Sequence, residues 1–150
     1  MTDAREEHEH ERGDRGRAER RRGDRGGRSV RHVKVDIEGL HLTEYSVGPA
    51  PMGDLHTHER HTDAFYVLEG ELEVATSETE TVLVGAGGFA VAPPGAIHAF
   101  AVPERARFLN IHAPGMNFAA YLREIVALGA RGEKPSRELF ERYDQHVLPR

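Results

Sequence analysis

The sequence predicts an all-β fold, an antiparallel sandwich or barrel, followed by two short α-helices. The first observation is the segment that begins at Val33, in which Val33, Val35 and Ile37 alternate with charged residues, as in a half-buried strand. The second is a change to helical spacing of the apolar residues after Pro114. The third is a series of short strand-like runs separated by Gly, Pro or polar turns: AFYVLEG, ELEVAT, TVLVGAG, GFAVAPP, HAFAV and RFLNIHA.

The 150 residues are enough for one domain, with a charged segment before it and a helical segment after it. Residues 1–28 contain eight acidic and nine basic side chains but only three apolar residues. Such a segment cannot bury enough apolar surface to offset its ordering entropy, so we predict a disordered tail. An RNA-contacting arginine-glycine arm is the alternative, which the interleaved acidic residues and the lack of aromatic residues disfavour. We assign residues 29–115 to a β-barrel and residues 116–150 to a helical extension.

The helical extension contains two amphipathic patterns. The first helix is predicted to begin after Asn117 as N-cap and to end near Gly129. The second is predicted from Ser136, its N-cap, to about Val147. We expect both helices to pack outside the barrel through their apolar stripes, which in the first helix consist of Phe118, Tyr121, Leu122, Ile125 and Val126.

The overall charge and the residue types present narrow the choice of partners and compartment. The formal net charge is -5, which gives no reason to expect binding to nucleic acid or to an anionic membrane. There is no cysteine, so a disulfide scaffold and a thiolate metal site are excluded. The sequence also has no apolar N-terminal leader and no apolar stretch long enough to span a bilayer. We therefore expect a cytoplasmic protein.

Three histidines and an aspartate form a candidate metal site. His56 and His58 are two residues apart, so on an extended segment both imidazoles project to the same face. Asp63 opens the next strand, and His98 follows the Pro93-Pro94-Gly95 turn at the start of another. These four groups supply the nitrogen and oxygen ligands that hold a divalent first-row metal where thiolates are missing.

Two segments resemble the conserved motifs of the cupin superfamily. GDLHTHERHTDAFYVLEG is similar to the first motif at its two histidines and at Gly70, with Asp63 where the family has glutamate. GGFAVAPPGAIHAF is similar to the second motif, with Val102 where asparagine is usual. The resemblance covers about residues 34–113. The C-terminal segments also look like the helical tail of small type-2 cupins that are quercetin dioxygenase-like.

The resemblance implies a double-stranded β-helix, the jelly-roll barrel of cupins, with one metal ion surrounded by His56, His58, Asp63 and His98. In this family the metal is commonly iron, manganese, nickel, zinc or copper. Aspartate is one methylene shorter than glutamate, so two outcomes stay open: Asp63 binds the metal in a tightened site, or three histidines bind it and water takes the fourth position. His61 has the opposite parity to His58, which predicts an outer-shell or exposed position. The remaining histidines of the barrel and helices are interpreted as structural: His32, His41, His112 and His146.

These features predict a metal-dependent, dioxygenase-like oxidoreductase that acts on a small aromatic or enolic compound, with Asp63 as metal ligand or base. A non-catalytic module that binds or senses a small molecule is the alternative. The shortened carboxylate and the missing motif asparagine are what a family member under relaxed catalytic requirements would show. A homodimer is expected, since the long alternating segment from Val30 would otherwise leave an exposed strand edge. Strand parity predicts an apolar substrate pocket that includes Phe65, Val67, Val91, Phe100 and Phe108.

Overall fold

The computed structural model describes residues 29–149, and the predicted disordered tail at residues 1–28 lies outside them. Nine strands and two helices make up this part of the chain. The helices are α1, Phe118–Ala130, and α2, Arg137–Arg142. The strands are β1 Val30–Ile37, β2 Leu40–Val47, β3 His56–Thr57, β4 Thr62–Ala75, β5 Thr81–Gly85, β6 Phe89–Ala92, β7 Ala99–Ala101, β8 Ala106–Ala113 and β9 His146–Val147.

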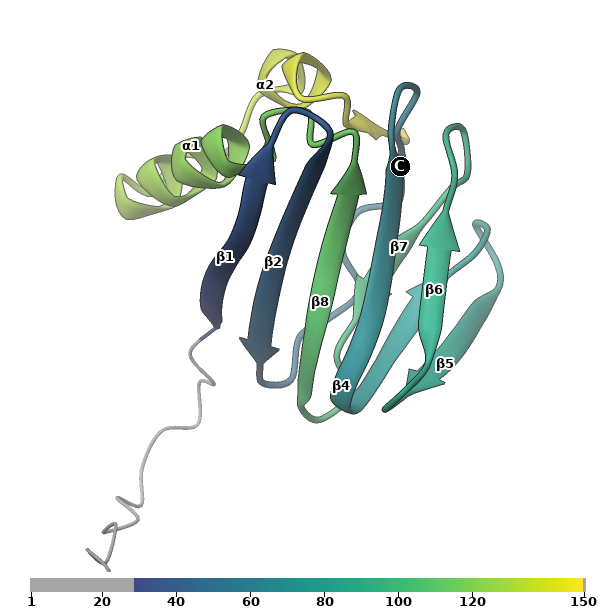
Figure 1. Cartoon of the computed structure of the whole chain (residues 1–150). Coiled ribbons are helices and arrows are strands. Elements are labelled where there is room, and N and C mark those ends of the chain that lie inside the picture. The colour runs from purple at the N-terminus through teal and green to yellow at the C-terminus, as the bar shows by residue number, and fades with distance from the viewer. Residues whose placement is uncertain (1–28, 150) are drawn as a thin grey trace, which may run out of the picture.

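The long strand β4 belongs to both layers of the barrel. Its first half pairs antiparallel with β6 and β8, and the layer continues through β2 to β1 at the edge. Its second half pairs with β5 and β7. Figure 1 shows β1, β2, β8 and β4 side by side, with α1 and α2 across one end of this layer. The predicted all-β fold with two short helices is confirmed.

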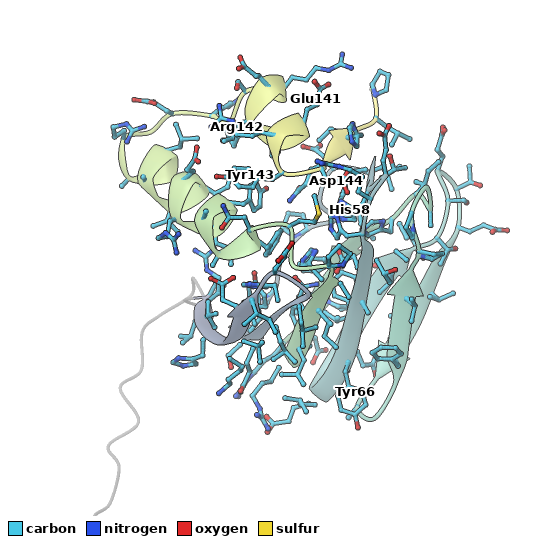
Figure 2. All side chains as sticks on the ribbon, turned by 45° about the horizontal axis from the view of Figure 1, so that its top comes forward. His58, Tyr66, Glu141, Arg142, Tyr143 and Asp144 are labelled. Carbon is cyan, nitrogen blue, oxygen red and sulfur yellow. The ribbon has the colours of Figure 1, made fainter. Side chains whose placement is uncertain are left out.

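The alternation of apolar and polar residues along β4 explains how the core forms. Asp63, Phe65 and Val67 point inward and are buried, whereas Tyr66 points outward. Figure 2 shows Tyr66 near the opposite end of the molecule from His58. The inward side chains of several strands pack together between the layers as one apolar cluster: Phe65, Val67, Leu72, Val74, Val102, Ala106 and Phe108.

The edge strand β1 differs from the expected half-buried strand. Val33 is 50% exposed and Ile37 is 64% exposed. The pairing with β2 shifts between Val33 and Val35, so an irregularity interrupts the two-residue period that the sequence shows. No described element covers the apolar side chains of β1 completely.

The second helix is shorter than predicted. Ser136 is its N-cap, and its hydroxyl accepts a hydrogen bond from the N–H of Leu139 over 3.1 Å. The helix ends at Arg142, because Asp144 adopts a left-handed backbone conformation with φ of 61°. The predicted extension to Val147 was therefore wrong, and His146–Val147 instead forms strand β9 against β3. Within residues 29–149, no helix is both long and apolar enough to cross a membrane.

Candidate metal centre

The two histidine-bearing segments meet through their backbones. The N–H of His56 donates to the carbonyl of His98 over 3.1 Å, and the N–H of His98 donates to the carbonyl of His56 over 3.0 Å. This bridge places the imidazoles of the two segments side by side. The ring centroids of His56 and His98 are 4.4 Å apart, and each ring centroid is 4.9 Å from that of His58.

Asp63 reaches this group of imidazoles despite its short side chain. Its Oδ2 lies 3.2 Å from Nε2 of His98 and 3.6 Å from Nε2 of His58. One ligand atom from each of His56, His58, Asp63 and His98 lies within 4.8 Å of the others. The structure thus brings together all four residues that the sequence singled out.

The backbone fixes which nitrogen of each imidazole faces the centre. Nδ1–H of His56 donates to the carbonyl of Asp54 over 2.9 Å, and Nδ1–H of His98 donates to that of Ala96 over 3.0 Å. Nδ1–H of His58 donates to the carbonyl of Asp144 over 2.8 Å. Because a carbonyl oxygen only accepts, Nδ1 carries the proton in each ring. Nε2 of His56 and Nε2 of His58 are then left to face the centre, whereas Nε2 of His98 contacts Oδ2 of Asp63 over 3.2 Å.

His58 gives the sharpest test of whether a metal fits here. Its Nε2 is buried and makes no hydrogen bond to any residue of the described chain. A buried polar atom without a partner is costly, and a divalent cation is a partner for an imidazole lone pair. Three imidazole nitrogens beside one carboxylate form a set of donor atoms that suits a transition metal. The side chains present at this centre therefore fit a metal ion.

The electrostatics of the centre favour a neutral His56 and an ionised Asp63, whereas His98 is shifted toward its charged form. Burial and the neighbouring His98 lower the pKa of His56 to about 4. Burial alone would raise the pKa of Asp63, but His112, His58 and His98 hold it well below its usual range. Burial likewise opposes a charged His98, yet its contact with Asp63 raises the pKa of that imidazole. With Asp63 ionised, the centre already carries the negative charge that a cation needs.

The chain is similar in sequence and in fold to known proteins. Residues 43–112 match the family model of the cupin domain. The match agrees with the described strands, which form the double-stranded β-helix fold of cupins. Among solved structures, an RmlC-like cupin from Shewanella frigidimarina is 25% identical, with a TM-score of 0.52 over 61% of this chain and 80% of that one. No curated protein is significantly similar to the chain.

Two further solved structures are similar to this chain. KdgF from Halomonas sp. is 25% identical, with a TM-score of 0.51, and the match covers 57% of this chain and 80% of that one. The polyketide cyclase RemF from Streptomyces resistomycificus is 27% identical, with a TM-score of 0.50 over 59% of this chain and 67% of that one. All these similarities agree with the cupin double-stranded β-helix.

A series of hydrogen-bonded, buried polar side chains surrounds the candidate metal centre. Nδ2 of Asn110 donates to Oδ1 of Asp63 over 2.6 Å, and Nε2 of His112 lies 2.9 Å from Oδ1 of Asn110. Nδ1 of His112 in turn lies 2.9 Å from Nε2 of His61. Nδ1–H of His61 donates to the carboxylate of Asp144 over 2.7 Å. His61 is therefore buried behind the centre rather than exposed.

Sequence reasoning missed three members of this chain of contacts. His112 was interpreted as structural, but its Nε2 lies 3.7 Å from Oδ1 of Asp63. The parity of RFLNIHA could have found it, because Phe108, Asn110 and His112 alternate and all three are buried. Asp144 gave no such signal, since it follows a helix far along the chain.

A cavity of about 220 Å³ opens beside the candidate metal centre. Phe65, Phe100 and Phe108, three of the residues expected in a substrate pocket, line it. Side chains of α1 close the opposite wall, so the apolar stripe of this helix faces the cavity at the end of the barrel. The α1 residues concerned are Phe118, Tyr121, Leu122 and Ile125.

Two residues expected in the pocket do not line this cavity. Val91 is 54% exposed, because it pairs with Ala64 and shares the outer face of β4 with that residue. Paired residues of adjacent strands point to the same side of a sheet, so the prediction for Val91 was wrong. Val67 points inward but lies in the apolar core beneath the cavity.

A second cavity, of about 380 Å³, adjoins the first. The two cavities share five lining residues, including His56 and Gln145, and the other three are Tyr45, Phe100 and Tyr121. A ligand that spans both would have one end beside the imidazoles and the other against the C-terminal segment.

Proposed function

We propose that this protein is a metal-dependent, dioxygenase-like oxidoreductase that acts on a small aromatic or enolic compound. His56, His58, Asp63 and His98 would hold one divalent transition metal. The observation that carries the proposal is the buried Nε2 of His58, which faces Asp63 and His98 and makes no hydrogen bond within residues 29–149.

The roles of the protein residues follow from their protonation states. When bound, an iron, manganese, nickel, zinc or copper ion supplies Lewis-acid chemistry and, for the redox-active members, electron transfer. The imidazoles of His56 and His58 would hold the metal through Nε2, because Nδ1 of each donates to a backbone carbonyl. Asp63 would act mainly as a ligand, since a carboxyl with a pKa far below its usual range is a weak general base.

The cavity supports an aromatic or enolic substrate. Its walls contain three phenylalanines of the barrel. Among residues 29–149, Asp63 is the only acidic or basic side chain other than histidine that lines it. A flat apolar molecule therefore fits better than a polyol or a phosphate ester. The similarity to a polyketide cyclase supports the same class, because polyketides carry enolisable carbonyl groups.

A module that binds or senses a small molecule without turnover is the second candidate. The same scarcity of charged lining residues favours it, because Asp63 is the single carboxylate that the described residues offer for proton transfer in the cavity. The two candidates differ in one outcome. An enzyme changes its ligand, whereas a sensor binds the ligand saturably and releases it unchanged.

The test begins with protein purified without a histidine tag. Elemental analysis is expected to find about one transition-metal ion per chain, and added metal is expected to raise the melting temperature. His58→Ala and His98→Ala should lose both effects, while His32→Ala, at an exposed position of β1, should keep them. Oxygen consumption with a flavonol then separates the enzyme from the sensor. Wild-type protein that neither contains nor takes up a metal would overturn the proposal.

A further inference from the structure

The C-terminal segment, residues 144–148, lies against the strand and loop that carry the metal-centre histidines. Strand β9 pairs with β3, with Val147 opposite His56. The N–H of Leu148 donates to the carbonyl of Leu55 over 2.9 Å. This segment lies beyond residues 43–112, which are the part that matches the cupin family model.

Asp144 makes four hydrogen bonds to consecutive residues of the histidine loop. Its backbone carbonyl accepts from Nδ1 of His58 over 2.8 Å. Its carboxylate accepts from the N–H of Glu59 over 3.0 Å, from the N–H of Arg60 over 2.8 Å and from Nδ1 of His61 over 2.7 Å. Figure 2 shows Asp144 beside His58, below α2.

The local structure explains why this residue is so firmly placed. Its side chain is fully buried, and its φ of 61° is a left-handed conformation that aspartate tolerates better than most residues. Burial alone would raise the pKa of Asp144, but the N–H groups of Arg60 and Glu59 and the imidazole of His61 lower it to about 2. Three of its hydrogen bonds hold the loop through the carboxylate, and Oδ1 also lies 3.2 Å from Nε2 of His146.

We propose that Asp144 is a positioning residue for the metal centre, through which the C-terminal segment holds His58 in its metal-binding orientation. The inference rests on the proposed metal-binding function. The carbonyl of Asp144 keeps the proton of His58 on Nδ1, so Nε2 presents its lone pair to the centre. The carboxylate of Asp144 holds the following loop, which prevents His58 from turning away.

A purely structural role for Asp144 predicts a different result. An anchor of the C-terminal segment would contribute to global stability and leave the metal centre of the folded protein unchanged. A positioning residue also sets the affinity and the ligand geometry of the metal. Outer hydrogen-bond partners of metal-binding histidines typically contribute about 10- to 100-fold to metal affinity.

The test compares Asp144→Asn with Tyr143→Phe. Asparagine keeps the left-handed conformation and the backbone carbonyl, but it replaces one acceptor oxygen by a donor facing N–H groups. Tyr143→Phe removes the neighbouring hydrogen bond from the Tyr143 hydroxyl to Glu124, over 2.5 Å, which does not touch the histidine loop. Apoprotein of each is titrated with Co²⁺, and affinity and visible absorption spectrum are recorded.

We expect Asp144→Asn to bind Co²⁺ about 10- to 100-fold more weakly with an altered spectrum, and Tyr143→Phe to match wild type. A folded Asp144→Asn protein with wild-type affinity and spectrum would overturn the positioning role while leaving the proposed function intact. Wild-type protein that takes up no Co²⁺ would instead overturn the proposed function, and this inference with it.

Hydrogen exchange on the wild-type protein gives a second measurement that needs no variant. Binding and positioning are reciprocal, so a metal that needs the C-terminal segment in place must also stabilise it. Co²⁺ is expected to slow exchange at the amides of Glu59, Arg60 and Leu148, which bridge the two segments. Unchanged exchange at these three amides in metal-loaded protein would contradict the proposal even if Asp144→Asn fails to fold.

Discussion

The side-chain amide of Asn110 and the carboxylate of Asp63 form a short hydrogen bond, 2.6 Å between Nδ2 and Oδ1. This bond occupies one carboxylate oxygen and leaves Oδ2 directed at the imidazoles of His58 and His98. The position where the second cupin motif usually has asparagine is Val102, which lies in the apolar core. Asn110, on the next strand, thus provides an amide contact to the centre of this chain.

Asn110→Ala is expected to lower the free energy of unfolding of the metal-free protein by about 1–3 kcal/mol. The substitution leaves the buried Oδ1 of Asp63 without its closest donor and Nε2 of His112 without its acceptor. Urea unfolding measures the change. Thr81→Ala is the control, because it removes an exposed side-chain hydrogen bond, to Glu73, and should cost less than about 0.5 kcal/mol. Equal effects of the two variants would contradict the argument.

Asp63→Asn is expected to weaken Mn²⁺ binding more than about 100-fold, as measured by calorimetric titration. The variant removes the negative charge that faces two imidazoles in a buried site, and a hundredfold loss corresponds to about 2.7 kcal/mol. Asp36→Asn is the matched control. Asp36 also lies near a histidine, with Oδ1 3.3 Å from Nδ1 of His41, but on the edge strand β1. Wild-type affinity in Asp63→Asn would indicate a site of three histidines with water in the fourth position.

The sequence predicts much of the fold and of the inner site because both depend on local regularities. Period-two alternation and turn residues predict the strands, and parity places His56 and His58 on one face. Side-chain parity does not predict the register, that is, which residues of neighbouring strands are paired. Val91 was misplaced because its side of the sheet depends on pairing with Ala64. Metal binding and the homodimer stay predictions.

The contact between His58 and Asp144 shows where sequence reasoning stops. The two residues are 86 positions apart, and their contact requires α2 to end at Arg142 so that the chain can turn back toward β3. The helical spacing of Leu139, Tyr143 and Val147 instead predicts a longer helix. Tertiary hydrogen bonds to the histidine loop outweigh that local preference.

The metal-free protein is expected to lose stability as the pH falls from 7 to 5. Burial lowers the pKa of His112 to about 3, and the pKa of His56 is lowered to about 4. Below pH 6.5 the unfolded chain therefore binds more protons than the folded chain at these histidines, so stability falls with acidification. Each contributes up to about 1.4 kcal/mol per pH unit.

His98 has the opposite effect on stability, since its pKa is raised in the folded protein. Its contribution to stability is fully present below the pKa of the unfolded state and is lost as the pH rises through the pKa of the folded state. Burial also lowers the pKa of His61, so three lowered pKa values oppose one raised value, and the net change on acidification is a loss of stability. Urea midpoints measured in metal-free buffer at pH 7, 6 and 5 check this expectation. A constant midpoint across this range would show that the buried histidines are not kept neutral.

Gly70→Ala is expected to destabilise the barrel by more than about 2 kcal/mol, whereas Gly85→Ala should change the free energy of unfolding by less than about 0.5 kcal/mol. Gly70 has φ of 73°, and a Cβ there would lie 1.9 Å from the carbonyl oxygen of Arg105. Neither its own backbone nor that of the neighbouring strand can yield easily, because β4 pairs with β8 at this point. A Cβ at Gly85, in β5, would meet no atom within 4 Å. Similar urea midpoints for the two variants would mean that β4 can relax at Gly70, which conflicts with its role as the strand shared by both layers.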